Sequence, residues 1–442
     1  MKKIYTTLLG LILALAYVQP VLAEGAGIEW DILNEEVVKY YQAGNYPKAV
    51  EYAQEALQIA EENVGAEHPD VATSLNNLAL LYKTQGNYSK AEPLYKRSLE
   101  ILENALGAEH PDVARSLNNL AVLYETQGNY SKAEPLYKRS LEISENALGA
   151  EHPDVARSLN NLAVLYKTQG NYSKAEPLYK RALEINEKVF GAEHPDVATS
   201  LNNLANLYET QGNYSKAESL YKRSLEISEN ALGAEHPDVA TSLNNLALLY
   251  NNQGNYSKTE PLYKRSLAIR ENALGAEHPD VATSLNNLAV LYNTQGNYSK
   301  AEPLYKRSLE IRENTLGAEH PAVATSLNNL AVLYKTQGNY SKAEPLYKRS
   351  LAIRENALGV EHPDVAASLN NLAGLYSTQD NYSKAEPLYK RALKILKKTL
   401  GANHPNMAIV MESLASLYRK TNRDSKAEKL EALVQQIREI NN

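Results

Sequence analysis

Histidine is the residue whose type and spacing first suggest chemistry in this chain. All nine histidines stand before proline in near copies of the phrase GAEHPDVA, and they recur every 42 residues. They are His68, His110, His152, His194, His236, His278, His320, His362 and His404. A zinc ion needs three or four ligands converging at about 2.0–2.3 Å, whereas histidines carried one per helical repeat lie about 10–20 Å apart. The spacing therefore favours a helix entrance, because the residue before proline is extended and proline suits the first helical position.

Catalysis would require one group of residues that differs from all the others. The serines, histidines and aspartates of this chain recur in equivalent surroundings from repeat to repeat, whereas an active site needs a single distinct constellation. The chain also contains no glycine-rich phosphate loop and no paired-carboxylate motif. The sequence therefore predicts a protein that is not an enzyme and that uses no metal and no cofactor.

One repeat unit spans residues 66–107, and the first half of this unit predicts an amphipathic helix. Pro69 suits its first position, and Gly86 marks the turn that ends it. Apolar residues recur at steps of three and four, which is the period of one helix face. These residues are Val71, Leu75, Leu78, Ala79 and Tyr82.

The second half of the unit predicts another helix. Ser89 and Glu92 fit a capping box. Pro93 follows about four residues in, where it lacks a hydrogen-bond donor, so the helix is expected to begin slightly later. Gly107 is expected to end it as a left-handed cap.

A single hairpin of this kind cannot bury its apolar faces, so stacked neighbours must cover them, as in a solenoid. Divergent, more polar units are expected at both ends as caps. The predicted organisation is a signal peptide at 1–23, a degenerate N-terminal capping repeat at 24–65, eight near-identical 42-residue repeats at 66–401 and a divergent C-terminal capping repeat at 402–442.

The N-terminal segment MKKIYTTLLGLILALAYVQPVLA has the layout of a signal peptide. Lys2 and Lys3 precede a short apolar core, and a small residue, Ala23, stands at the expected cleavage site. The alternative is a transmembrane anchor, but the apolar run is short and ends near Pro20. Cleavage would remove two lysines and change the formal net charge from −6 to −8. We expect an exported protein, periplasmic or secreted.

Charge and cysteine content exclude several classes of partner. Lysine and arginine total 46 and aspartate and glutamate total 52, and both signs are mixed within each repeat. This pattern indicates a solvated helix surface and no binding of nucleic acid. Because the chain has no cysteine, neither a disulfide framework nor a lipid-anchored cysteine is available. After signal cleavage, no stable membrane insertion is expected.

The repeat resembles the tetratricopeptide repeat, in the 42-residue version found in kinesin light chains. The resemblance covers about 28–442. It implies an all-α, right-handed superhelical α-solenoid of about ten helix-turn-helix repeats. It does not transfer the motor function, because no heptad segment precedes the first repeat. The residues that carry it are Leu75, Leu78, Ala79, Tyr82, Gly86, Tyr88, Ala91, Tyr95 and Ser98.

The resemblance also implies a peptide-binding role for the asparagine that follows the first leucine of each first helix. In kinesin light chain repeats this residue contacts the peptide backbone within a concave groove. The matching positions are Asn76, Asn118, Asn160, Asn202, Asn244, Asn286, Asn328 and Asn370. An amide carries both donors and acceptors, so it can bind any backbone. The alternative is that these asparagines only pack against the next helix, and that their constancy reflects recent duplication.

Variable residues flank this asparagine stripe on the same helix face. Basic residues among them are candidates for side-chain selection, namely Arg115, Arg157, Lys83, Lys167 and Lys335. On the second helix, position 102 also varies, with a basic trend late in the chain. The series runs Leu102, Ser144, Asn186, Ser228, Arg270, Arg312 and Arg354. We interpret this second series as surface drift or as a second contact face.

Two functions of different classes fit these observations. The first is a protein-interaction scaffold whose groove binds peptide segments of partner proteins. The second is a structural or self-assembling solenoid with no dedicated ligand. Polar residues in the last repeat, such as Arg423 and Asp424, argue against an apolar end on which another copy would stack. The sequence does not identify the partner.

Overall fold

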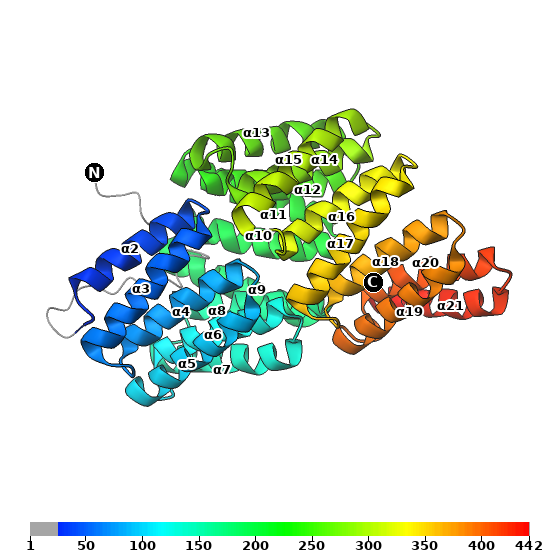
Figure 1. Cartoon of the computed structure of the whole chain (residues 1–442). Helices are drawn as coiled ribbons and strands as arrows, with labels where there is room; N and C mark the ends of the chain where they lie inside the picture. Colours follow the sequence, from blue (N-terminus) through cyan, green and yellow to red (C-terminus); the bar gives the residue numbers. More distant parts are fainter. Residues whose placement is uncertain (1–24, 442) are drawn as a thin grey trace. The chain divides into compact units, whose positions relative to one another are not determined.

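The computed structural model describes residues 25–441, and all regular secondary structure in this range is helical. The predicted signal peptide at 1–23 lies outside the described residues. The helices, shown in Figure 1, are α2 Ile28–Gln42, α3 Tyr46–Val64, α4 Pro69–Thr84, α5 Tyr88–Leu106, α6 Pro111–Thr126, α7 Tyr130–Leu148, α8 Pro153–Thr168, α9 Tyr172–Phe190, α10 Pro195–Thr210, α11 Tyr214–Leu232, α12 Pro237–Asn252, α13 Tyr256–Leu274, α14 Pro279–Thr294, α15 Tyr298–Leu316, α16 Pro321–Thr336, α17 Tyr340–Leu358, α18 Pro363–Thr378, α19 Tyr382–Thr399, α20 Pro405–Lys420 and α21 Asp424–Asn441. The predicted all-α fold of helix-turn-helix repeats is confirmed.

Each even-numbered helix and the helix after it form a hairpin, and we call the two members helix A and helix B. In the hairpin of α4 and α5 (Figure 1), Gly86 has φ 72°, which glycine adopts without steric cost. The backbone N–H of Asn87 then donates to the carbonyl of Tyr82 at 2.8 Å and closes the turn. Farther along, the Ser98 hydroxyl of helix B donates to the carbonyl of Ala72 in helix A at 2.7 Å. These bonds fix the two helices of a repeat to each other.

Helix B begins earlier than predicted. Helix α5 starts at Tyr88 with Asn87 as its N-cap, so the predicted capping box of Ser89 is wrong. Pro93 lies inside the helix. It is tolerated because the carbonyl that loses its i+4 donor belongs to Ser89, which is solvent-exposed. Gly107 ends the helix with φ 89° and ψ 153°, so a positive φ is confirmed but ψ is extended and not left-handed helical.

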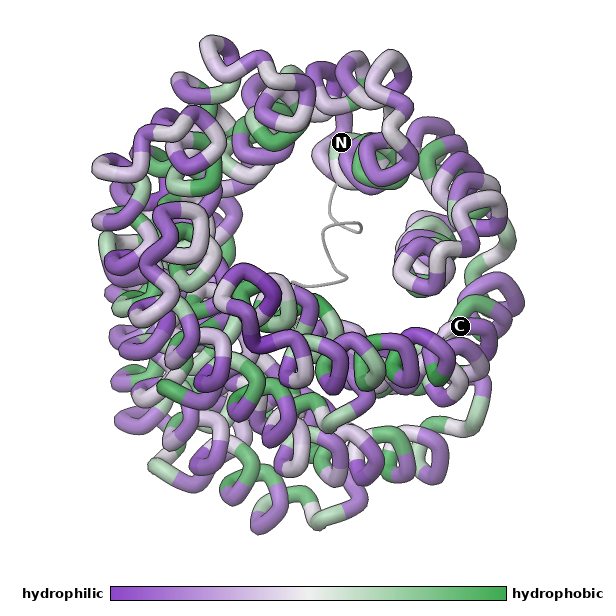
Figure 2. Tube along the Cα trace, turned by 90° about the vertical axis from the view of Figure 1, so that its right-hand side faces the viewer, coloured by the Kyte–Doolittle hydropathy of each residue, from purple (hydrophilic) through white to green (hydrophobic). Residues whose placement is uncertain are grey.

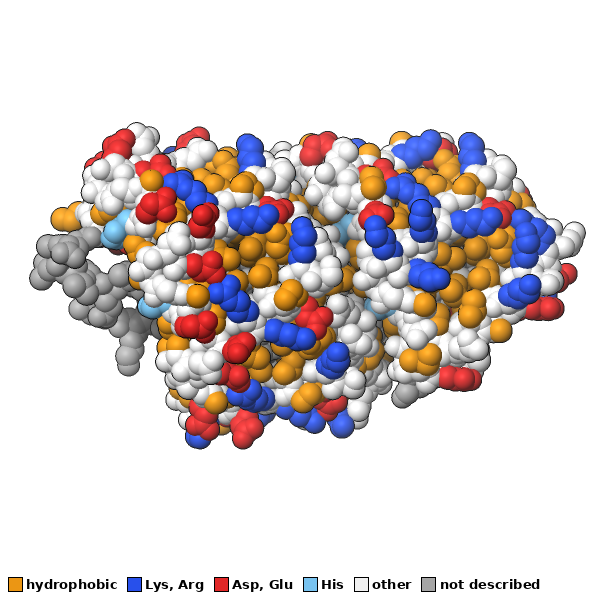
Figure 3. Space-filling view, turned by 90° about the horizontal axis from the view of Figure 1, so that it is seen from below, with side chains coloured by type: hydrophobic (Ala, Val, Ile, Leu, Met, Phe, Trp, Pro, Cys, Tyr) orange, Lys and Arg blue, Asp and Glu red, His pale blue; other side chains and the backbone are white. Residues whose placement is uncertain are grey.

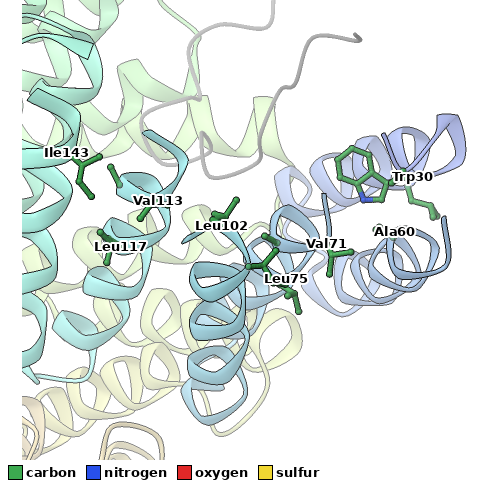
Figure 4. Packing of buried hydrophobic residues seen from close by; sticks show 14 residues of the cluster. Trp30, Ala60, Val71, Leu75, Leu102, Val113, Leu117 and Ile143 are labelled. Atoms are coloured by element: carbon green, nitrogen blue, oxygen red, sulfur yellow. The ribbon is translucent and has the colours of Figure 1, made fainter. Parts of the chain in front are cut away.

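Apolar side chains from several successive hairpins form the core. Figure 2 shows hydrophobic and hydrophilic residues mixed along the helices that face the viewer, as expected of amphipathic helices. Around α2 to α7 one buried cluster joins three repeats (Figure 4), with Trp30, Ala60, Val71, Leu75, Leu102, Val113, Leu117 and Ile143 among its members. The indole N–H of Trp30 also donates to the Ser74 hydroxyl at 2.7 Å. The only tryptophan thus ties the first repeat to the second.

The described chain divides into two compact units. The first runs to Glu125 and adds Ser131–Leu165 and Ser173–Ser284. The second takes Thr126–Tyr130, Tyr166–Tyr172 and the chain from Leu285 onward. Each unit also contains contacts between segments far apart in sequence, which involve the histidines.

The arginines of the position-102 series are buried, so their interpretation as surface drift or as a second contact face is wrong. Arg270 is 7% exposed. Its Nη1 donates to the Ser284 hydroxyl at 2.9 Å and to the Asp280 carbonyl at 3.2 Å. Its Nη2 donates to the Thr241 hydroxyl at 3.2 Å. The guanidinium therefore connects helix B to its own helix A and to the next one, and Arg354 repeats this arrangement.

Ser116 and Ser284 hold the same place in two repeats but differ in their partners. Ser284 accepts from Arg270, whereas the buried Ser116 hydroxyl has no partner among residues 25–441 because Leu102 stands in the arginine position. We expect Ser284→Ala to lower the free energy of unfolding by about 1–3 kcal/mol, since it leaves a buried donor unpaired. Ser116→Ala is expected to lower the free energy of unfolding by less than about 1 kcal/mol. It could even raise this free energy, because the buried hydroxyl that it removes has no partner. Urea unfolding of the two variants measures this, and equal losses would contradict the pairing.

Candidate functional site

The nine histidines are the N-caps of the nine helices A that begin with proline. In each, the imidazole Nδ1 accepts a hydrogen bond from the backbone N–H two residues later, at 3.0–3.2 Å. This satisfies one of the free N–H groups of the first turn. The prediction of a helix entrance is therefore confirmed. Within 25–441, no group of three or more histidine, aspartate or glutamate side chains is placed to hold a metal ion.

Three of these histidines make a second contact far along the chain, each within one unit. The Nε2 of His278 lies 3.2 Å from the carbonyl oxygen of Gln42. His362 and His404 make the same contact with the carbonyls of Thr126 and Thr168, at 3.1 and 3.2 Å. Because Nδ1 already accepts a hydrogen bond, the proton resides on Nε2 and is donated to the carbonyl. Only the neutral imidazole makes both bonds, and burial lowers the pKa of all three histidines.

This arrangement predicts that the protein loses stability in mild acid. The folded-state pKa of these three histidines lies below the unfolded value of about 6.5, so the unfolded chain binds more protons in this range. The contribution of these histidines to the free energy of unfolding is therefore complete above about pH 6.5. It is lost as the pH falls through their folded-state pKa. We expect the urea midpoint of the wild type to fall between pH 8 and pH 5. It should fall less in a variant with His278, His362 and His404 changed to asparagine, which caps helices without titrating. Parallel pH profiles would contradict the role of the imidazoles.

The predicted asparagine stripe forms a ladder of amide hydrogen bonds between repeats. Where the ladder is formed, the asparagine that follows one stripe residue donates through Nδ2 to the stripe residue of the preceding repeat. Asn119 donates to Asn76 at 3.0 Å, and Asn371 donates to Asn328 at 2.8 Å. Further steps join Asn161 to Asn118 and Asn329 to Asn286, both at 2.9 Å. These stripe residues, Asn76, Asn118, Asn286 and Asn328, are 7–9% exposed, so they contribute to the packing of one repeat on the next.

The other stripe residues, Asn160, Asn202, Asn244 and Asn370, are half-buried. The Oδ1 atoms of Asn160, Asn202 and Asn370 are buried and accept no hydrogen bond within the described part of the chain. Asn202 still donates through Nδ2 to the Ser242 hydroxyl at 3.2 Å. An unpaired buried acceptor is costly, and the terminal torsion of asparagine is broad. Asn160 and Asn370 therefore carry an amide oxygen whose hydrogen-bonding capacity residues 25–441 do not use.

The predicted basic residues fall into two groups on helix A. Arg115 and Arg157 lie in the first turn and pair with Asp112 and Asp154 of their own helices, at 2.7 and 2.8 Å. Lys83, Lys167 and Lys335 lie in the last turn and are half-buried.

Burial lowers the pKa of Lys83 to about 8, although the nearby Glu125 acts in the opposite direction. Burial also lowers the pKa of Lys335. The last turn of helix A thus holds ammonium groups that are poorly solvated.

Acidic residues at the same last-turn position have a role that the sequence did not reveal. Glu209 is 8% exposed and accepts from the Tyr221 hydroxyl at 2.9 Å and from Asn252 Nδ2 at 2.8 Å. Glu125 accepts from the Tyr137 hydroxyl at 2.7 Å. The alternation of lysine and glutamate at this position was a visible signal, but the tyrosine partner on helix B could not be assigned from spacing alone.

A hollow on the helix-A side of the last three repeats was also missed. It measures about 430 Å³. Its lining includes Lys335, Asn370, Gly374, Tyr389, Glu412 and Ser413. The sequence signal was Gly374, which stands where most repeats have valine or leucine and where Asn206 and Ser416 occur in two others. The sequence did not show that the space left by this glycine stays open.

Charged side chains of both signs occur on the face of the molecule shown in Figure 3. On the face shown in Figure 3, lysine and arginine side chains are interspersed with aspartate and glutamate, with apolar side chains between them. Among the helices of residues 25–441, none is long and apolar enough to cross a membrane.

Comparison with known proteins identifies the repeat. The family model described as tetratricopeptide repeat matches nine overlapping segments, which are 39–104, 85–146, 112–188, 154–230, 196–258, 238–314, 295–356, 323–398 and 364–439. No curated protein matches the chain.

Three solved structures are similar to this chain. The crystal structure of BtubC (BKLC) from P. vanneervenii is 29% identical, with a TM-score of 0.44, and the match covers 52% of this chain and 92% of that one. A putative kinesin light chain from Podosopora anserina with nearly identical TPR-like repeats is 30% identical, with a TM-score of 0.39, covering 47% and 98%. A Rap protein complexed with competence and sporulation factor is 18% identical, with a TM-score of 0.55, covering 84% and 98%. The Rap match supports the fold alone, and the family model supports the assignment: the chain belongs to the tetratricopeptide repeat family.

Proposed function

We propose that this protein is an exported scaffold that binds peptide segments of partner proteins along the helix-A face. The observation that carries the proposal is the amide ladder, in which the Oδ1 atoms of Asn160, Asn202 and Asn370 lack the hydrogen bond between repeats that Asn118 and Asn328 accept. A bound backbone can supply the missing partner, because each peptide unit carries one donor and one acceptor. The Rap protein, a structure of the same fold, was solved as a complex with competence and sporulation factor, which is compatible with this role.

Export is part of the proposal and rests on the N-terminal sequence. N-terminal sequencing of the protein recovered from its own cells should begin at Glu24 if Ala23 is the cleavage site. A chain that still begins at Met1 would contradict export through a cleaved signal peptide.

The self-assembly alternative is less well supported by the last repeat. In inner repeats a helix-B leucine packs on the next helix A, as Leu141 does against Val155 and Leu159. The equivalent residue of α21 is Gln435, which is exposed. The last repeat therefore presents a polar residue where inner repeats present a packing leucine, as a cap requires, although Ile409, Leu433 and Ile440 of this repeat are also exposed.

The proposal predicts which asparagines matter for binding and not for folding. We expect Asn160→Ala with Asn202→Ala to weaken peptide binding about 5–150-fold, as the loss of two hydrogen bonds implies. The variant should lose only about 0.5–1.5 kcal/mol of stability, since neither Oδ1 is paired and Asn202 gives up only its hydrogen bond to the Ser242 hydroxyl. Peptides selected on the full chain from a random library of 12-residue sequences provide the ligand, and fluorescence anisotropy measures the affinity.

A matched pair of ladder residues serves as the control. Asn118→Ala with Asn328→Ala removes two paired oxygens, so this variant should lose stability in urea. Selection of no peptide by the wild type would contradict the proposed function. Unchanged affinity in the first variant would place the binding surface elsewhere.

A further inference from the structure

Three contacts join the start of one helix A to the turn after another helix A that lies six repeats earlier. They are the contacts of His278, His362 and His404 with a backbone carbonyl. Glycine permits the close approach, since a Cβ atom on Gly44 or Gly128 would lie 2.7 or 2.9 Å from the proline that begins the docked helix. Each contact therefore fits a histidine-proline entrance into a glycine turn.

The tyrosine that follows each turn is buried by this contact. Tyr46 and Tyr130 follow covered turns and are 9% and 7% exposed. Tyr172 is half-buried, and there the docked proline lies farther from the turn. Tyr214 follows the turn at Gly212, where a Cβ atom would meet nothing within 4 Å, and it is 38% exposed. Docking thus removes apolar surface from water in addition to forming a hydrogen bond.

The turn side of this contact also occurs uncovered. The turns after α12, α14 and α16 contain Gly254, Gly296 and Gly338, which have φ of 72°, 74° and 74°. A Cβ atom on any of these glycines would meet nothing within 4 Å. The sequence TQGNY of the covered turn at 126–130 returns unchanged at 294–298 and 336–340. We call these three turns the turn edge.

The histidine side occurs uncovered as well, before α4, α6 and α8. The side chains of His68, His110 and His152 are 33%, 39% and 40% exposed, compared with 8% for His278. Nδ1 of each caps its helix as it does in the docked histidines, so the Nε2–H is left to donate elsewhere. Within residues 25–441 these Nε2 atoms have no hydrogen-bond partner. We call these three entrances the histidine edge.

We propose that the turn edge of one copy of this chain binds the histidine edge of a second copy. Each Nε2–H donates to the carbonyl two residues before a turn glycine, as His278 does to Gln42. The partner is a second copy because the chain already makes this contact with itself, between segments of the same sequence. The surfaces are the ends of helices A, so the polar last hairpin does not need to stack on another copy. This inference does not depend on peptide binding.

The two edges are different surfaces of one chain, so the contact is heterologous. A copy that is bound through one edge still presents the other, and such contacts add copies one after another. We expect sedimentation velocity of the full chain to show a coefficient that rises steadily with protein concentration, through dimers to larger species.

Two variants each block one edge. His110→Asn with His152→Asn keeps the helix caps but removes two donors, and should weaken association about 5–150-fold. Gly296→Ala with Gly338→Ala places a Cβ atom where the docked proline must lie, and should weaken association at least about 10-fold. Circular dichroism checks that both variants fold. Mixing them should restore a one-to-one complex and nothing larger, because each variant keeps one intact edge.

His278→Asn is the matched control, since this histidine is already docked within the chain. It should leave association unchanged. Three results would overturn the inference: a wild type that stays monomeric at every concentration, a wild type that stops at a dimer, or edge variants that associate as strongly as the wild type. None of these results bears on peptide binding, which is measured separately on dilute protein.

Discussion

Arg270→Ala should lower the free energy of unfolding by about 2–4 kcal/mol, because it leaves a cavity and the unpaired hydroxyl of Ser284 at a buried boundary between repeats. Burial disfavours the charged guanidinium and lowers the pKa of Arg270. The arginine is therefore held by its hydrogen bonds and its packing. Since a repeat packs mainly on its neighbours along the array, apart from long-range contacts such as that of His278 with Gln42, the damage should be largely local and the urea transition should broaden.

The chain itself supplies the control for this prediction. Leu102 and Leu396 occupy the arginine position in other repeats. Arg270→Leu should therefore cost no more than about 1–1.5 kcal/mol, since apolar replacements of buried charged groups are often tolerated. If Arg270→Leu is as destabilising as Arg270→Ala, the hydrogen bonds and not the packing hold this boundary together.

Gly128→Ala is the second change with a large expected effect, about 2–5 kcal/mol. Gly128 has φ 68°, so a side chain there pays about 1–2 kcal/mol for the left-handed backbone. A Cβ atom would also lie 2.9 Å from Pro363 Cδ and 3.0 Å from His362 Cδ2, which adds about 1–3 kcal/mol of overpacking. Thermal and urea unfolding both measure the loss.

Gly254→Ala separates the two causes. Gly254 ends an equivalent helix A with φ 72°, and a Cβ atom there meets nothing within 4 Å. It should therefore cost only about 1–2 kcal/mol, the backbone part alone. Equal losses at Gly128 and Gly254 would mean that the start of α18 does not pack on the turn after α6 in solution.

The sequence was sufficient to predict the elements that local chemistry determines. The His-Pro pairs predicted the start of each helix A, since proline has a fixed φ and the residue before it is extended. The start of helix B was misplaced because Ser89 and Glu92 match a capping box, whereas the short turn at Gly86 already commits Tyr88 to the helix. In this case the geometry of the turn, and not the capping-box motif, determines where helix B begins.

Contacts between repeats were the part that periodicity could not predict. Arg270, a member of the position-102 series, looks like a surface residue on a helical wheel. In the structure the next helix A covers it and offers Ser284 as a partner. The unpaired Oδ1 of Asn370 depends on Ser413, which lies 43 residues later in the sequence. The candidate stripe was found from the sequence, but the members with an unpaired Oδ1 were identified only from the hydrogen bonds of the ladder.

The most direct test of peptide recognition by the amide ladder is a double-mutant cycle with a backbone-methylated peptide. Each backbone nitrogen of a selected 12-residue peptide is methylated in turn, and affinity is measured for the wild type and for the Asn160→Ala, Asn202→Ala variant. If an asparagine accepts a backbone N–H, methylation at one position should weaken binding to the wild type about 2–13-fold, the value of one hydrogen bond. The same methylation should leave binding to the variant unchanged. Equal losses in both proteins at every position would contradict backbone recognition by these amides.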